Sequence, residues 1–128
     1  MRVFATKWFA RFARKERISA HQLGEAVHRA ELGLIDANLG GGLIKQRVAR
    51  SGGGRSGGYR TLIAFHAKQR SVFLYGFAKS ERDNIDATEL ADLKKLAGRY
   101  LDLTDGEIEK ALSESELMEF FYHAREER

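Results

Sequence analysis

Six cationic residues lie between residues 43 and 85, in or next to strand-like sequence, and their types and spacing suit the binding of phosphate groups. These residues are Lys45, Arg47, Arg55, Arg60, Lys79 and Arg82. Arginine binds phosphate oxygens through a planar, permanently charged fork, and lysine supplies a compact point charge. A single cation is most often a solvated surface charge. Several cations on neighbouring strands instead predict a binding site for a polyanion.

Three runs rich in β-branched, aromatic and aliphatic residues are predicted to form the strands that hold these cations, at residues 43–49, 59–66 and 71–78. Alternation along a strand places Lys45 and Arg47 on one face, with Ile44 and Val48 on the other. Arg60 shares its face with Leu62 and Ala64 by the same rule. The third run is apolar on both faces, which is typical of a strand in the middle of a sheet. We expect an antiparallel sheet with Lys45, Arg47, Arg60 and Lys79 near one end.

The first two runs are joined by SGGGRSGG, in which five of eight residues are glycine and Arg55 lies in the middle. This loop lacks the Gly-Lys-Ser/Thr sequence of a phosphate-binding loop. Two interpretations stay open. The glycines serve flexibility alone, as in a linker, or they let backbone N–H groups and Arg55 approach a phosphate.

Composition and charge narrow the classes of protein. The 128 residues predict one domain, and the lack of cysteine excludes disulfides and thiolate chemistry. No apolar run is long enough to span a membrane, and we expect neither a secretory signal nor a membrane partner, hence a cytoplasmic protein. Residues 1–82 hold 16 Lys and Arg against 5 Asp and Glu, whereas residues 83–128 hold 6 against 13. This asymmetry favours an anionic partner for the basic part.

Helices are predicted on both sides of the central strands. A first strand at residues 2–6 leads into a basic helix over 7–17, whose Trp8, Phe9 and Phe12 we expect in the core, although such helices also bind membranes or acidic partners. Ser19 and Gln22 form a capping-box pattern that opens a second helix. One helical turn at 80–85 and a helix over 86–100 follow, and a second capping-box pattern, Thr104 with Glu107, opens another helix. Residues 115–128 have helical propensity.

Three motifs then occur in order: GLIKQRVAR, GRSGGYRTLIAF and FLYGFAKSERDNI. Together they resemble the HigB-type branch of the RelE/ParE toxin superfamily. The resemblance covers roughly the first hundred residues. It implies an α+β fold in which an N-terminal helical hairpin packs on a small twisted antiparallel sheet, with additional C-terminal helices. We expect a toxin domain at residues 1–103 and a helical extension of the same domain at 104–128.

The resemblance also implies an activity and partners. The chain is expected to be the toxin of a type II toxin–antitoxin system, an mRNA-cleaving endoribonuclease that acts on the ribosome and inhibits translation. Its partners would be mRNA and a HigA-like antitoxin with a helix-turn-helix domain. No cofactor or metal is expected.

Cleavage of RNA without a metal requires deprotonation of the 2′-OH, stabilisation of charge on the phosphate, and protonation of the leaving 5′-oxygen. Arg60 is the first candidate for charge stabilisation, and Lys79 the second, as a phosphate clamp or as an acid or base. Lys45, Arg47, Arg55 and Arg82 are predicted to bind flanking phosphates, the last two with less support. The base is not identified: His66 is expected far from the site, and Tyr59, Tyr75, Tyr122 and His123 are weak candidates.

Two other functions remain open. The superfamily also includes ParE-like toxins that inhibit gyrase and need no nuclease site. A non-catalytic RNA-binding protein is the second alternative, because a basic sheet with aromatic residues binds RNA without cutting it.

Overall fold

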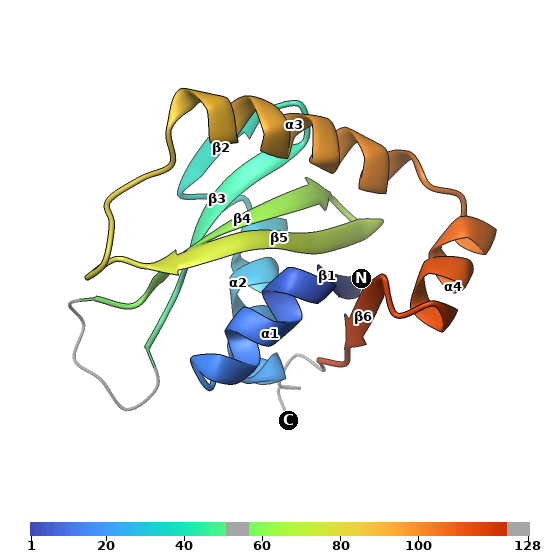
Figure 1. Cartoon of the computed structure of the whole chain (residues 1–128), viewed down its shortest axis with the longest axis horizontal. Coiled ribbons are helices and arrows are strands. Elements are labelled where there is room, and N and C mark those ends of the chain that lie inside the picture. Colours follow the sequence, from blue (N-terminus) through green and yellow to red (C-terminus); the bar gives the residue numbers. More distant parts are fainter. Residues whose placement is uncertain (51–56, 123–128) are drawn as a thin grey trace.

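A six-stranded sheet lies in the middle of the structure and separates two helical layers (Figure 1). The computed structural model describes residues 1–50 and 57–122 of the chain. The strand order across the sheet is β2-β3-β4-β5-β1-β6. The strands are β1 (Arg2–Thr6), β2 (Ala37–Gly40), β3 (Leu43–Val48), β4 (Tyr59–His66), β5 (Arg70–Ala78) and β6 (Leu117–Phe120). The predicted α+β class is therefore confirmed.

The strands β2 to β5 follow one another as antiparallel neighbours, so the three predicted central strands are adjacent in space. The central position predicted for β5 is confirmed, because β4 and β1 flank it. The sheet is mostly antiparallel, as predicted, with one exception: β1 pairs with β5 in parallel, with Phe4 opposite Val72. Helices and three other strands separate these two strands in the chain. Local sequence patterns do not reveal such a distant pairing.

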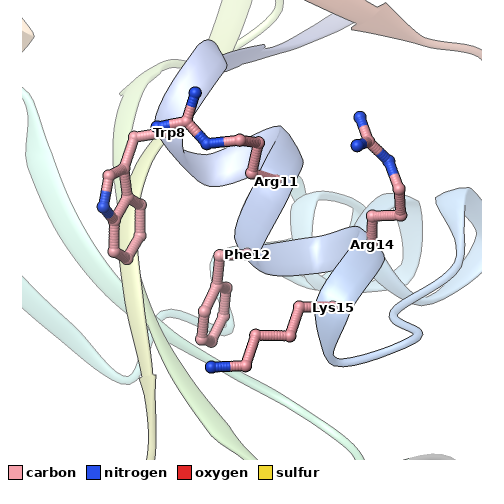
Figure 2. A pocket seen from close by; sticks show the side chains of 5 residues that line it. All are labelled: Trp8, Arg11, Phe12, Arg14 and Lys15. Carbon is pink, nitrogen blue, oxygen red and sulfur yellow. The ribbon is translucent and has the colours of Figure 1, made fainter.

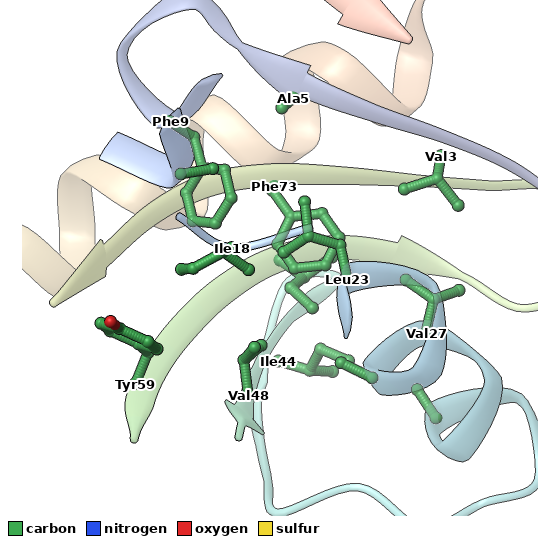
Figure 3. Close-up of a cluster of buried hydrophobic side chains, with 14 of the residues drawn as sticks. Val3, Ala5, Phe9, Ile18, Leu23, Val27, Ile44, Val48, Tyr59 and Phe73 are labelled. Atoms are coloured by element: carbon green, nitrogen blue, oxygen red, sulfur yellow. The ribbon is translucent and has the colours of Figure 1, made fainter. Parts of the chain in front are cut away.

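One face of the sheet is covered by the two N-terminal helices, α1 (Lys7–Lys15) and α2 (Ala20–Glu31). The predicted capping box at Ser19 and Gln22 is present and opens α2. Phe9 of α1 and Leu23 of α2 are fully buried against Phe73 of β5 (Figure 3). This cluster joins the helical hairpin to the sheet. Burial of large side chains of this kind contributes about 1.5–3 kcal/mol each.

The other face is covered by α3 (Ala87–Asp102), drawn above the sheet in Figure 1. Its Ala97 and Tyr100 are buried in a second cluster, with Leu62 and Ala64 of β4. The short helix α4 (Asp105–Ser113) follows and places Ile108 in the same cluster. The predicted capping box at Thr104 and Glu107 opens α4. A capping box of the same kind, formed by Asp86 and Glu89, opens α3.

Two local predictions are wrong. Residues 117–120, predicted to be helical, form the edge strand β6, which pairs with β1 in antiparallel order. Ser115 ends α4 with a positive φ of 61°, and Arg2 then binds the carboxylate of Glu119 at 2.9 Å. The segment 80–85, predicted to be a helical turn, contains a hydrogen-bonded turn from Ala78 to Arg82 and continues irregularly to α3. Pairing with β1 decides the first segment, and contacts of Arg82 with Glu89 and Tyr75 hold the second, so local propensity does not decide either one.

Candidate nucleic-acid interface

The register of β3, β4 and β5 brings three predicted cations together on one face of the sheet. Arg47 lies directly opposite Arg60, and Lys45 lies opposite Leu62. Directly opposed side chains project from the same face, and Leu62 packs in the cluster beneath α3. The face that carries Lys45, Arg47 and Arg60 is therefore the α3 face, at the end of the sheet beyond the start of that helix. Ile44 and Val48 are buried on the opposite face, as the alternation predicts.

Arg60 is the central residue of this group. It lies on β4 between Arg47 of β3 and Phe77 of β5, its two register partners. The residue is half-buried, and its Nη1 atom is buried without any hydrogen-bond partner in the described part of the chain. A buried donor without a partner is costly, and like charges placed directly opposite each other on a sheet are unfavourable. An anion bound at Arg60 relieves both costs.

Lys79 follows β5 directly and lies at the same end of the sheet as Arg60. Its backbone N–H donates to the carbonyl of Gly58, one residue before β4, at 3.1 Å. Gly58 has a φ of 71°, and a Cβ there would lie 3.0 Å from the carbonyl oxygen of Val48. Glycine is thus required at this point. The Lys79 side chain is exposed.

Arg82 is held by the protein itself, in contrast to the other cations. Its guanidinium donates to the carboxylate of Glu89 at 2.6 Å, to the backbone oxygen of Asn84 at 2.8 Å, and to the Tyr75 hydroxyl at 3.3 Å. It also lies over the ring of Phe77, 5.2 Å from the centroid. The hydrogen bond to Glu89 raises the pKa of Arg82, and the same contact lowers the pKa of Glu89. Arg82 therefore ties the 79–86 segment to α3 beside the cationic group.

The described structure places none of the remaining candidates, two histidines, one tyrosine and the loop arginine, in the cationic group. Arg55 and His123 lie outside the described residues. His66 lies at the far end of β4 from Arg60, as expected, in the last pair before the β4–β5 turn. Tyr59 projects from the opposite face and donates to the Glu16 carboxylate at 3.1 Å. Burial, followed by the Glu16 contact, raises the pKa of Tyr59.

Tyr75 and Tyr122 differ in their relation to the site. Tyr75 shares the face of Leu62 and Lys45 and contacts Arg82. The ring of Tyr122 packs against α2 at Gly24, where an added Cβ would fall 1.9 Å from that ring. Tyr75 is thus the one predicted tyrosine that the described structure places on the cationic face.

Sequence reasoning missed the role of aromatic residues around the cations. Phe77 was assigned only to a strand, but it is the register partner of Arg60 and supports the Arg82 guanidinium. Trp8 was expected in the core and is 41% exposed. The spacing of Phe77 and Arg82 across a turn gives no sequence signal for their contact, whereas the alternation of β5 does place Phe77 on the face of Tyr75.

The charge of the site is strongly one-sided. None of Lys45, Arg47, Arg60 and Lys79 forms an ion pair with another described residue. The carboxylate of Asp36 accepts from the backbone N–H of Arg47 at 2.6 Å rather than from its side chain. Among residues 1–50 and 57–122, no three His, Asp or Glu side chains are grouped so that they could hold a metal ion. Such an arrangement of unpaired cations suits the phosphate backbone of a nucleic acid.

None of the helices described here has the length and apolar character needed to cross a membrane.

No curated protein matches the chain significantly. The model of one protein family matches residues 1–120, and this family is described as the RelE toxin of the RelE/RelB toxin–antitoxin system. The match covers nearly the whole chain and includes every strand of the sheet. The chain therefore belongs to the RelE toxin family of toxin–antitoxin systems.

Proposed function

We propose that this toxin is an endoribonuclease that cleaves mRNA and so inhibits translation in the cytoplasm. The observation that carries the proposal is Arg60, a strand arginine with a buried, unpartnered Nη1 directly opposite a second arginine. A rigid, unpaired guanidinium is suited to a phosphate whose negative charge increases in the transition state. Lys45 and Arg47 extend this positive surface along β3, where they would contact flanking phosphates.

In the proposed reaction the 2′-OH gives its proton to water, its oxygen bonds to the adjacent phosphorus, and the bond to the 5′-oxygen breaks, which yields a 2′,3′-cyclic phosphate and, after protonation of the 5′-oxygen, a 5′-OH. Arg60 donates to the non-bridging oxygens as their charge increases. Lys79, exposed at the end of β5, clamps the phosphate or donates the proton to the leaving 5′-oxygen. Arg82 is committed to Glu89 and Tyr75, so we assign it to positioning the 79–86 segment rather than to direct RNA contact.

The resemblance of three sequence motifs to HigB-type toxins supports a more specific assignment. We propose mRNA positioned on the ribosome as the substrate and a HigA-like helix-turn-helix antitoxin as the protein partner. We further propose that residues 1–103 carry the toxin activity and that residues 104–128 extend the same domain. The pairing of β6 with β1 supports a single domain, because both strands belong to the one sheet.

Arg60→Ala and Lys79→Ala, singly and together, test the nuclease proposal. The variants are expressed in bacteria beside the unaltered chain, and new mRNA ends are mapped by primer extension. We expect growth arrest with new ends for the unaltered chain, and a loss of cleavage of about 10²–10³-fold for Arg60→Ala, the size typical of removing one transition-state donor. Lys110→Ala on α4, an exposed lysine at the other end of the molecule, is the matched control.

The fold of Arg60→Ala is checked by thermal unfolding. Because Nη1 has no partner to lose, we expect the variant to be at least as stable as the unaltered chain. Growth arrest without new mRNA ends would point to gyrase or another target. RNA binding without cleavage or arrest would identify a non-catalytic RNA-binding protein.

A further inference from the structure

The outer side of α1 carries an exposed aromatic surface that the proposed cleavage site does not use. Trp8 is 41% exposed. Its ring stacks on Phe12, with centroids 5.5 Å apart and planes 11° from parallel, and on Tyr75 at 4.7 Å and 29°. The two neighbouring rings fix the indole in one orientation while leaving part of it open to solvent. A fixed, partly exposed ring is suited to stacking with another flat group.

Unpaired cations surround this ring. Helix α1 has the sequence KWFARFARK, with four cations and no acidic residue. Lys7, Arg11, Arg14 and Lys15 are all exposed, and none has an ion-pair partner among the described residues. Trp8, Phe12 and three of these cations, Arg11, Arg14 and Lys15, line a shallow hollow of about 520 Å³ (Figure 2). The surface therefore combines flat apolar rings with positive charge.

A second hollow joins this surface to the cationic face of the sheet. It has a volume of about 230 Å³ and holds both charge types: Lys15 and Arg82 lie beside the carboxylates of Glu16 and Glu81, and the rest of the lining is Trp8, Phe12, Tyr75, Gly76 and Phe77. Phe77 is the register partner of Arg60, and its ring lies 6.3 Å from that of Tyr75. Successive aromatic contacts thus run from Phe77 through Tyr75 to Trp8. A single RNA strand bound at Arg60 can follow these aromatic residues to α1.

We propose that α1 binds the part of the single-stranded mRNA that flanks the cleaved phosphate, with one base stacked on Trp8 and phosphates held by Arg11 and Lys15. The inference rests on the proposed nuclease function and assigns a second contact to the same substrate. Nucleic acid is favoured over an acidic protein segment because the exposed apolar lining consists of the flat rings of Trp8 and Phe12. A protein helix needs a continuous apolar groove, whereas a base needs one ring and an adjacent cation.

Trp8 is the only tryptophan of the chain, so its fluorescence reports directly on this contact. The probe is a single-stranded oligoadenylate of about twelve nucleotides with 2′-O-methyl groups, which block attack by the 2′-oxygen and keep the strand intact. We expect the emission of Trp8 to be quenched when the oligonucleotide binds at low salt. The same oligonucleotide, carrying a dye, gives the affinity of each variant by anisotropy.

Trp8→Ala is expected to weaken binding about tenfold, and Trp8→Phe to retain most of the affinity because a ring remains. Leu32→Ala is the matched control, since Leu32 is an exposed apolar residue of 63% exposure that follows α2. Arg11→Ala should reduce the salt dependence of binding, with Lys110→Ala as its control. Thermal unfolding of each variant excludes a general loss of structure.

The outcomes separate this inference from the nuclease proposal. In one outcome Arg60→Ala weakens RNA binding, but RNA leaves the emission of Trp8 unchanged and Trp8→Ala binds RNA as tightly as the unaltered chain. This outcome would overturn the α1 contact and leave the proposed cleavage site intact. Quenching by the antitoxin but not by RNA would assign α1 to the protein partner and would also overturn it. An absence of both RNA binding and RNA cleavage would contradict the proposed function itself.

Discussion

At the scale of single residues, Tyr100 joins the end of α3 to the segment that leads into β6. Its hydroxyl donates to the Glu116 carboxylate at 3.0 Å. Burial, followed by this hydrogen bond, raises the pKa of Tyr100 from 10.0 to about 12. The folded state therefore holds the phenolic proton over a pH range in which the unfolded chain releases it.

This difference predicts a dependence of stability on pH. Below about pH 10 the tyrosine is protonated in both states, and its contribution is complete. Between about pH 10 and 12 the unfolded state binds fewer protons, so the contribution of this group to the free energy of unfolding is progressively lost. Urea unfolding at pH 8, 10 and 11 measures this loss, and the free energy of unfolding of Tyr100→Phe should depend less steeply on pH. An identical pH dependence in the variant would contradict the assignment of the loss to Tyr100.

Residue-level prediction from sequence succeeded where strand alternation applied and failed where contacts depend on tertiary structure. Alternation correctly placed Lys45 with Arg47 on one face of β3, and Arg60 with Leu62 on one face of β4, because every side chain in a strand follows the same period. That the two faces coincide follows only from the register of β3 against β4. It gave no information on Arg82, whose partners Glu89 and Tyr75 come from other elements. The lack of a partner at Arg60 Nη1 is likewise visible only in the folded chain.

At the scale of elements, the beginning of α3 is linked to the site by one carboxylate. Glu89 accepts from the backbone N–H of Asp86 in the capping box and also from Arg82. Glu107 completes the capping box of α4 in the same way, with Thr104, and no arginine contact to it is found in the described residues. Among the described residues, the capping boxes of α3 and α4 therefore differ in one respect: the glutamate of the α3 box, Glu89, also forms an ion pair with Arg82.

Glu89→Gln tests what that ion pair does. Glutamine still completes a capping box, so only the negative charge is lost, and Glu107→Gln is the matched control. Because exposed ion pairs contribute little, we expect either change to leave the free energy of unfolding nearly unchanged. Only Glu89→Gln frees the charge of Arg82, and it should increase RNA affinity and its salt dependence, measured by anisotropy. Equal RNA affinities in the two variants would contradict a role for the pair at the site.

The elements themselves were predictable where the chain carries local signals. Ser19 with Gln22 and Thr104 with Glu107 mark the starts of α2 and α4, because capping is decided within four residues. The short strands β2 and β6 escaped prediction, since four residues carry too little periodicity. Leu117 becomes part of a strand because β1 provides a partner for its backbone.

At the scale of the whole molecule, β6 closes the sheet on the outer side of β1. Leu117 is 1% exposed in the cluster beneath α3 and α4. We expect Leu117→Ala to reduce the free energy of unfolding by about 2–4 kcal/mol, because it leaves a cavity in the core. Leu32→Ala, at an exposed site, should change it by less than about 0.5 kcal/mol. Both values are measured by urea unfolding.

Removal of residues 117–128 tests the same closure more severely. It uncovers the backbone edge of β1, and an open edge strand promotes pairing between chains. We expect the shortened chain to associate or precipitate, as measured by light scattering. A monomeric shortened chain with unchanged stability would show that the sheet does not need β6.

The parallel pairing of β1 with β5 also has a consequence for the order of folding during synthesis. Residues 2–6 leave the ribosome well before their partners at 70–73 and 117–120. The hairpins of β3, β4 and β5 need only neighbouring sequence, and contacts between distant residues form more slowly than local ones. We therefore expect β3, β4 and β5, which carry the cations, to pair with one another before β1 docks beside β5. In that order of events the nascent toxin presents its positive surface before its core is complete.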